Sequence, residues 1–420
     1  MNYYDSEYFT YKNNMLYCED VPVLSILEKE GSPTYIYSKK YFIDRYNEFH
    51  NAFKDIDHII FYASKCNFNI SVIKTFADQG AGIDVNSGGE LYRALRAGVK
   101  PEKMLFSGVG KTEEEIQMGL EHDVLLLKAE SVDEIMQINE IAGKLGKTAR
   151  VAIRVNPNVD AKTHPYISTG LSENKFGINA RDAVNIFMEL SALKNIEFTG
   201  IDMHIGSQIT TTDPFAEAVD KLAEVFLKLK EKGLKLKHFD IGGGMGVKYH
   251  DNNPFAMSEL ASAVMPTFKK LNCQVFFEPG RYLTANGAIL ATKVLNTKMN
   301  GQKNFIIVDS AMTDLIRPSF YGAYHHIEPV EIKKDSQDIT ADIVGPVCES
   351  SDFLAKGREI SAAKAGDYLA VMSAGAYSMV MASNYNGRRR PAEILVDGSK
   401  YDVVRKRETY EDLVANEILI

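Results

Sequence analysis

The strongest constraint on the fold is a regular alternation of strand-like and helix-like segments between residues 41 and 280. Short apolar runs rich in β-branched and aromatic residues predict strands, and the longer amphipathic segments between them predict helices. Strands are predicted at 59–64, 82–85, 104–108, 123–128, 149–155, 198–206, 237–244 and 273–280. Helices are predicted at 41–53, 70–79, 88–98, 112–120, 131–146, 180–190, 213–233 and 258–271.

Alternation of this kind predicts a parallel sheet, because a parallel strand can be reached only through a crossover connection. Eight repeats over about 240 residues fit a (β/α)8 TIM barrel, which typically takes ~250 residues. An open, doubly wound sheet is the alternative. It would normally carry a glycine-rich fingerprint after its first strand, and residues 65–69, KCNFN, do not provide one.

After residue 280 the pattern changes to short alternating runs at 288–298, 304–310, 338–345, 367–373 and 392–398. No long helical segments separate these runs, so we expect a β-sandwich or β-barrel domain. The N-terminal residues, including TYIYS at 34–38, are also strand-like, and we expect them to join this domain. The expected division is N-terminal strands 1–38, barrel 39–280 and C-terminal β domain 281–420.

Composition narrows the functional classes. The net charge is −8, which argues against a nucleic-acid-binding surface, and no apolar run approaches membrane-spanning length. The first residues lack a basic region followed by an apolar stretch, so we expect a cytoplasmic protein. The four cysteines are widely spaced without a CxxC pair, so neither a metal site nor a disulfide framework is expected.

Lys65 follows the predicted strand 59–64 directly. An ammonium group avoids apolar surroundings, and partial desolvation favours the neutral amine, which can attack a carbonyl to form a Schiff base. A lone lysine at such a position more often caps the strand and extends into solvent. The other strand ends decide between these interpretations.

Active sites of TIM barrels lie at the C-terminal ends of the strands. Gly242–Gly244 follows the seventh predicted strand, where bare backbone N–H groups can approach a phosphate. Glu278 and Gly280 follow the eighth, and Glu278 can hold a protonated ring nitrogen or pair locally with Arg281. Two further strand ends carry His204, which is either a site residue or a satisfied core histidine, and Asp84, which could pair with a nearby lysine.

Together, a Schiff-base lysine, a phosphate cradle, a carboxylate and an imidazole suit pyridoxal 5′-phosphate. The fold and the lysine alone would also fit a Schiff-base aldolase. The carboxylate after the eighth strand favours the pyridine cofactor.

Motifs along nearly the whole chain match a known family. The chain resembles the fold-type III pyridoxal-phosphate decarboxylases, and within them the diaminopimelate branch. The matching stretches are FYASKCN (61–67), DVNSGGELYRALRAG (84–98), FSGVGKTEEEI (106–116), RVNPNVDAKTHPYISTGLSENKFGI (154–178), HIGSQ (204–208), DIGGGMG (240–246), EPGRYL (278–283), DSAMTDLIRPSFYGAYH (309–325), GPVCESSDFLA (345–355) and GAYSMVMASNYNGRRRP (375–391).

The resemblance implies roles for individual residues. Lys65 would carry the cofactor, His204 would stack on its ring, and Glu278 would hold the pyridine nitrogen. Phosphate and other cofactor contacts would come from Asp84, Ser207, Gly243, Gly244, Gly280, Arg281 and Tyr377. Substrate contacts would come from Arg281, Arg317, Tyr321, Glu349 and Tyr377, and Cys348 would be the acid that reprotonates the α-carbon.

The implied reaction is decarboxylation of meso-2,6-diaminopimelate to L-lysine and carbon dioxide, the last step of lysine biosynthesis. The implied assembly is a homodimer in which the partner supplies Cys348 and Glu349. The long polar loop at 156–177 could act as a lid over the substrate.

Two other functions compete with this one. The first is decarboxylation of another basic amino acid such as ornithine or arginine, against which the 154–178 segment and Arg317 argue. The second is a non-catalytic, cofactor-binding regulator on the same fold, against which Lys65 and Cys348 argue. One departure from the family pattern is Cys66, where alanine is usual, which places a thiol beside the Schiff-base lysine.

Overall fold

The computed structural model describes residues 7–161, 169–170, 175–334 and 336–420. Its internal contacts divide the chain into two compact units. The barrel unit comprises residues 45–247 and 253–283. The sheet unit comprises the described residues up to 44, residues 248–252 and residues 284–420.

The barrel unit is built on a closed parallel sheet. Within the described residues, eight strands each pair with the next along the chain, and the last pairs with the first. This closure confirms the predicted TIM barrel. The strands are β5 (His58–Ala63), β6 (Gly82–Val85), β7 (Met104–Phe106), β8 (Leu126–Ala129), β9 (Ala149–Asn156), β11 (Ile196–Asp202), β12 (His238–Asp240) and β13 (Gln274–Phe277), with the two-residue β10 (Ile178–Asn179) added beside β9.

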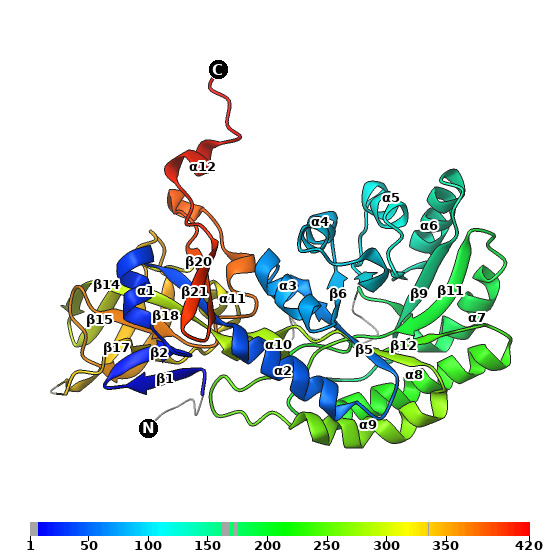
Figure 1. Ribbon diagram of the computed structural model, residues 1–420, viewed down its shortest axis with the longest axis horizontal. Helices are drawn as coiled ribbons and strands as arrows, with labels where there is room; N and C mark the ends of the chain where they lie inside the picture. The colour runs from blue at the N-terminus through cyan, green and yellow to red at the C-terminus, as the bar shows by residue number, and fades with distance from the viewer. Residues whose placement is uncertain (1–6, 162–168, 171–174, 335) are drawn as a thin grey trace. The chain divides into compact units, whose positions relative to one another are not determined.

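Helices alternate with these strands, and Figure 1 shows the first of them following one another around the barrel. In the helix predicted at 112–120, the Thr112 side chain and Glu115 form a capping box. Ser131 caps the next helix, because its side chain accepts a hydrogen bond from the Glu134 N–H. The helices are α2 (Lys39–Ala52), which leads into the barrel unit, α3 (Ile70–Asp78), α4 (Gly88–Arg96), α5 (Glu113–Glu121), α6 (Val132–Lys144), α7 (Ala180–Leu190), α8 (Asp213–Glu231) and α9 (Met257–Leu271).

Several predicted strands are too long, and the reason is local backbone geometry. Strand β8 begins at Leu126 rather than at 123, because Asp123 has a left-handed φ of 58°. Strand β7 ends at Phe106 and β12 at Asp240, since Gly108 and Gly242 adopt φ values of 106° and 70°. Predicted strands 198–206 and 273–280 likewise end early, at 202 and 277. The residues trimmed from the C-terminal ends of these strands form the loops that carry the candidate site.

The barrel interior is apolar over part of its length. Phe61, Leu105, Leu126, Ala152 and Phe276 form one buried cluster drawn from five strands. The rings of Phe61 and Phe276 meet edge to face with their centroids 4.8 Å apart, a favoured aromatic geometry. This packing fixes β13 against β5, where the barrel closes.

The sheet unit contains a small antiparallel sheet and a large mixed one, which confirms the predicted β domain. The small sheet comprises β1 (Phe9–Lys12), β2 (Met15–Cys18) and β3 (Val21–Pro22), followed by α1 (Val23–Glu30). In the large sheet β4 (Thr34–Ser38) pairs with both β14 and β20, so the TYIYS segment is an inner strand. The other strands of the large sheet are β14 (Ala288–Asn300), β15 (Lys303–Val308), β16 (Ile327–Pro329), β17 (Asp338–Val344), β18 (Phe353–Ser361), β19 (Tyr368–Val371), β20 (Ala392–Asp397) and β21 (Lys400–Arg405). The short helix α10 (Arg281–Thr284) links the barrel unit to the sheet unit, whose further helices are α11 (Arg317–Tyr321) and α12 (Tyr410–Val414).

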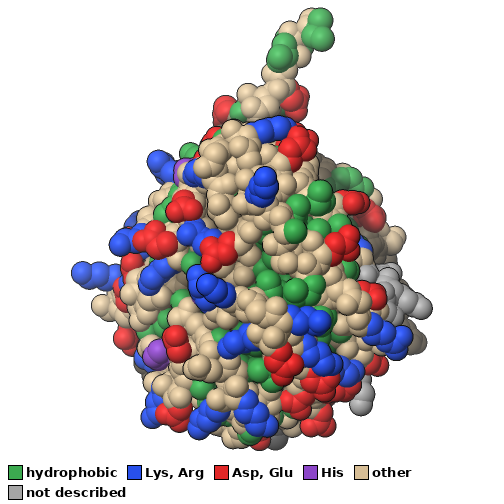
Figure 2. Space-filling model, turned by 90° about the vertical axis from the view of Figure 1, so that its right-hand side faces the viewer, with side chains coloured by type: hydrophobic (Ala, Val, Ile, Leu, Met, Phe, Trp, Pro, Cys, Tyr) green, Lys and Arg blue, Asp and Glu red, His purple; other side chains and the backbone are tan. Residues whose placement is uncertain are grey.

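The molecular surface mixes charges. On the face that Figure 2 shows, Lys and Arg side chains intermix with Asp and Glu side chains. None of the helices in the described part of the chain is both long and apolar enough to cross a membrane.

We expect Phe276→Ala to destabilise the barrel unit by about 3–5 kcal/mol, because it removes a fully buried ring and leaves a cavity beside Phe61. The matched control is Tyr92→Ala, since Tyr92 is an aromatic residue on α4 with 58% of its surface exposed. Thermal unfolding followed by circular dichroism measures both. Equal melting temperatures for the two variants would contradict the assignment of Phe276 to the core.

Candidate active site

Lys65 lies on a single 3-10 turn, Ser64–Cys66, directly after β5. Its side chain is partly buried, while both neighbours in the turn are fully buried. The Ser64 hydroxyl donates to the Asp84 carbonyl oxygen at 2.9 Å and to Glu90 Oε2 at 3.0 Å. These bonds fix the turn that presents Lys65 at the end of the strand. Glu90 was not predicted, because nothing in the sequence indicates that the start of α4 contacts this turn.

The Asp84 carboxylate accepts hydrogen bonds from neutral side chains. Ser107 Oγ donates to Asp84 Oδ1 at 2.5 Å, and Asn86 Nδ2 approaches Oδ2 at 3.4 Å. The carboxylate is fully buried at the end of β6. Its contacts therefore link the ends of β6 and β7.

The glycines after β12 and β13 allow three loops to approach closely. A Cβ built on Gly243 would lie 2.2 Å from the Glu278 carbonyl oxygen, and one on Gly244 would lie 2.4 Å from the Gly206 carbonyl oxygen. A Cβ on Gly280 would lie 3.0 Å from Cys66 Sγ. Only glycine fits the first two positions, so the loops bring their backbones together at one end of the barrel.

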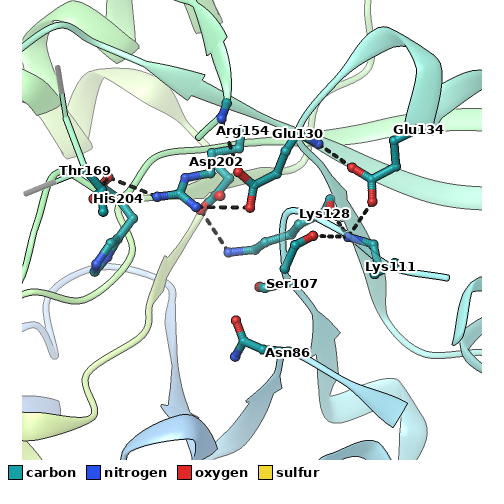
Figure 3. Close-up of polar contacts among 12 residues, drawn as sticks. Asn86, Ser107, Lys111, Lys128, Glu130, Glu134, Arg154, Thr169, Asp202 and His204 are labelled. Carbon is teal, nitrogen blue, oxygen red and sulfur yellow. Dashed lines mark hydrogen bonds and ion pairs between the residues drawn. The ribbon is translucent and has the colours of Figure 1, made fainter. Parts of the chain in front are cut away.

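His204 lies just beyond β11 and is held from two sides. The Gly243 N–H donates to its Nδ1 at 3.2 Å, so the ring is neutral with its proton on Nε2. Its carbonyl oxygen accepts from Thr169 Oγ1 at 2.8 Å and from Arg154 Nη2 at 3.2 Å (Figure 3). Burial, followed by the charges of Lys65, Arg154 and Lys128, holds the pKa of His204 well below its ordinary value. The imidazole is therefore available as a neutral, flat surface.

Arg281 follows Gly280 and is buried. Its Nη2 and Nε donate to Ser207 Oγ at 3.1 and 3.4 Å, so two predicted cofactor residues meet. Glu278 forms its ion pair elsewhere, with Lys128 of β8.

Lys128 stands at the end of the predicted strand 123–128, and sequence reasoning assigned it no role. It is 1% exposed, and its Nζ contacts Asp202 Oδ1 at 2.8 Å, Asp240 Oδ2 at 2.5 Å and Glu278 Oε1. Figure 3 shows its side chain pointing toward Asp202. Both aspartates are the last residues of their strands, β11 and β12. That shared position was the only sequence signal, because strand ends of a barrel converge.

The electrostatics of this cluster are unusual. Burial and the neighbouring carboxylates raise the pKa of Glu278 well above its ordinary value, against the opposite effect of Lys128. Burial raises the pKa of Asp240 to about 6. Asp202, Asp240 and Glu278 have ligand oxygens within 4.8 Å of one another, a spacing that suits a metal ion. The Lys128 ammonium contacts all three, so it supplies the positive charge there.

The remaining predicted residues belong to the sheet unit. Arg317 begins α11, is buried, and contacts His325 Nε2 through its Nε at 3.3 Å. Its guanidinium lies over the rings of Tyr249 and Tyr321, 5.1 and 5.9 Å from their centroids. Attraction between the positive charge and the faces of the two rings orients the planar guanidinium group.

Cys348 and Glu349 are exposed in the sheet unit. The Cys348 N–H donates to Asn386 Oδ1 at 2.9 Å, and Ser351 Oγ donates to Glu349 Oε1 at 2.5 Å. Tyr377 adopts a φ of 56°, a strained value for a residue with a large side chain, and such strain clusters at functional sites. Of the predicted lid at 156–177, residues 162–168 and 171–174 lie outside the described residues.

Comparison with known proteins places this arrangement in a family. A model of the pyridoxal binding domain of pyridoxal-dependent decarboxylases matches residues 39–285. A diaminopimelate decarboxylase of Aquifex aeolicus is 46% identical over 97% of this chain and 96% of its own length. One of Haemophilus influenzae is 46% identical over 98% of this chain and all 100% of its own.

A solved structure agrees with these relatives. The crystal structure of diaminopimelate decarboxylase from Helicobacter pylori complexed with L-lysine matches with a TM-score of 0.90 and 39% identity. It covers 94% of this chain and 98% of that chain. This chain therefore belongs to the pyridoxal-dependent decarboxylases, in the diaminopimelate decarboxylase family.

Proposed function

We propose that the chain decarboxylates meso-2,6-diaminopimelate to L-lysine and carbon dioxide, with pyridoxal 5′-phosphate as its cofactor. The observation that carries the proposal is identity of 46% over nearly the full length of two diaminopimelate decarboxylases. The H. pylori relative is complexed with L-lysine, the product of the proposed reaction. This reaction is the last step of lysine biosynthesis.

The donor set at the end of the barrel fits the cofactor. The close approach of the loops at Gly243, Gly244 and Gly280 leaves no room for side chains, so the backbone there can come near a phosphate, with Ser207 beside Arg281. The acidic cluster around Glu278 carries more negative than positive charge, which suits a protonated ring nitrogen. Lys65 would hold the cofactor covalently, and the neutral His204 ring would lie against its plane.

Pyridoxal phosphate, when bound, draws electrons from the substrate α-carbon into its ring. The chain's own residues then have to orient the substrate and return a proton. We assign proton delivery to Cys348, whose exposed position in the sheet unit is compatible with use by a partner subunit. The proposed active unit is accordingly a homodimer.

Meso-diaminopimelate carries an amino group and a carboxylate at each end, so its recognition needs cations and anions beyond the cofactor. Arg281 and Arg317 are assigned to the distal carboxylate, because a guanidinium can bind it in bidentate fashion. Glu349 is assigned to the distal ammonium group, and Tyr321 and Tyr377 to neighbouring substrate contacts. The position of the Arg317 guanidinium over the rings of Tyr249 and Tyr321 supports a fixed orientation for such binding.

The experiment that tests the function is release of carbon dioxide from meso-diaminopimelate, ornithine, arginine and lysine, each with added pyridoxal phosphate. We expect turnover of meso-diaminopimelate alone, with lysine as the product. Turnover of ornithine or arginine instead would overturn the assigned distal contacts. Bound cofactor without turnover of any substrate would favour a regulatory protein.

Lys65→Ala should abolish turnover and the covalent bond to the cofactor, because alanine has no amine to attack the aldehyde. Borohydride reduction followed by mass spectrometry of the intact chain measures the trapped cofactor. The control is Lys74→Ala on α3, an exposed lysine paired with Asp78 at 2.7 Å, which should keep both properties. Trapped cofactor in the Lys65 variant would refute the assignment.

Cys348→Ala should lower kcat by about 10²–10⁴-fold, the range for loss of a positioned proton donor, and leave cofactor binding intact. The control is Cys273→Ala, which removes a partly buried thiol from the residue before β13. Steady-state kinetics and the visible spectrum of the bound cofactor give the two readouts. Unchanged kcat in Cys348→Ala would remove this thiol from the mechanism.

A further inference from the structure

One buried ammonium group in the barrel interior is shared by three carboxylates. Lys128 Nζ donates to Asp202, to Asp240 and to Glu278, and all four side chains are buried. An ammonium group has three N–H donors, so these acceptors use its full capacity. With all four groups ionised, one positive and three negative charges leave a formal net charge of −2.

Such a cluster is a poor way to stabilise a barrel. Removing ions from water is costly, and apolar replacements of buried ion pairs are often neutral or stabilising. The same interior holds an apolar cluster that includes Leu126, two residues before Lys128 on the same strand. A surplus of negative charge beside apolar packing therefore calls for a functional reason.

The cluster touches three segments assigned to the cofactor. Asp202 ends the strand that leads into His204, and Asp240 Oδ1 accepts the N–H of Gly242 at 2.8 Å, next to Gly243. Glu278 is the carboxylate assigned to the ring nitrogen. Lys128 comes from a strand to which no cofactor role was assigned, and it contacts Glu278 directly.

We propose that Lys128 is a positioning residue that keeps Glu278 an ionised carboxylate, so that the shared proton resides on the ring nitrogen of the cofactor. The inference deepens the proposed function and rests on its assignment of Glu278 to that nitrogen. A protonated ring nitrogen strengthens the withdrawal of electrons from the substrate. Lys128 would thus act on the reaction through Glu278 without touching the cofactor.

The direction follows from the charges that face Glu278. Asp84 from β6, Asp202 from β11 and Asp240 from β12 all raise its pKa, in addition to burial. Lys128 from β8 is the cation that lowers it. Lys65 and Arg154 act together with Lys128 on the neighbouring His204. Because Lys128 contacts Glu278 directly, its charge lowers the proton affinity of the carboxylate more than that of a ring nitrogen on the carboxylate's far side.

The test is 15N NMR of the enzyme loaded with pyridoxal phosphate labelled at the ring nitrogen, recorded at pH 8. In the unmodified enzyme we expect the shift of a protonated pyridine. In Lys128→Met the carboxyl retains the proton, so we expect a shift toward unprotonated pyridine. We also expect kcat to fall, because a smaller fraction of the bound cofactor carries a protonated ring nitrogen. An unchanged 15N shift in a folded, loaded Lys128→Met enzyme would overturn the inference.

A second variant and a rescue separate charge from packing. Lys128→Gln keeps hydrogen-bond donors on its side-chain amide but loses the positive charge. It should move the 15N shift toward unprotonated pyridine, as Lys128→Met does. If Lys128→Met does not fold, the Lys128→Gln result tests the inference by itself. Adding Asp202→Asn to Lys128→Met returns the formal charge of the cluster from −3 to −2 and should restore much of the protonated signal. A purely structural role for Lys128 predicts no such rescue.

The matched control is Lys111→Met. Lys111 is also buried in the barrel unit, and among the described residues its ion pair is with one carboxylate, that of Glu134, at 2.8 Å (Figure 3). Loss of this ammonium should leave the 15N shift unchanged even if it lowers stability. A shift equal to that of Lys128→Met would show that any buried lysine produces the effect and would overturn the inference.

Glu278→Gln distinguishes failure of the inference from failure of the proposed function. If the 15N shift changes in Glu278→Gln but stays unchanged in both Lys128 variants, only the role of Lys128 is refuted. An unchanged shift in Glu278→Gln would show that Glu278 does not face the ring nitrogen, and would overturn the cofactor assignment on which both rest.

Discussion

The closure of the barrel between β5 and β13 is the constraint on which the candidate site depends. These are its first and last strands, and Phe277 pairs with Ile60 across the seam. The pairing sets the Lys65 turn beside the loop that carries Glu278 and Gly280, and a Cβ at Gly280 would meet Cys66. Residues far apart in the chain therefore become neighbours only because an apolar cluster, with Phe61 against Phe276, holds the seam.

Much of the fold could be predicted because the alternation of apolar patterns reports directly on local structure. The predicted ends of the strands were less accurate than the strands themselves. The sequence does not show where a residue with a left-handed backbone conformation, such as Asp123 or Gly242, interrupts the hydrogen bonding between strands. The error fell mostly on the C-terminal ends of the strands. Those residues read as continuations of apolar runs, although their backbone turns away to form the site.

Some residues of the candidate site could be predicted from the sequence, and others could not. Lys65, Glu278 and the glycines could be proposed from their positions after strands, because such positions converge in a TIM barrel. The partnership of Lys128 with Asp202 and Asp240 could not, since pattern and spacing do not reveal which inward-facing side chains of non-adjacent strands meet. Roles for Arg317, Cys348 and Glu349 came only from resemblance, as strand-end logic does not extend to the sheet unit.

The chemistry of the proposed substrate explains why the assigned residues fall on two units. The reacting carbon of any amino acid presents the same groups to the cofactor, so the barrel residues assigned to the cofactor alone, such as Lys65 and His204, need not distinguish one substrate from another. What differs between diaminopimelate and a diamine precursor such as ornithine is the far end, where a second carboxylate must be bound. Assigning that end to Arg317 and Glu349 of the sheet unit lets substrate choice change without disturbing Lys65, His204 or the charge balance at Glu278.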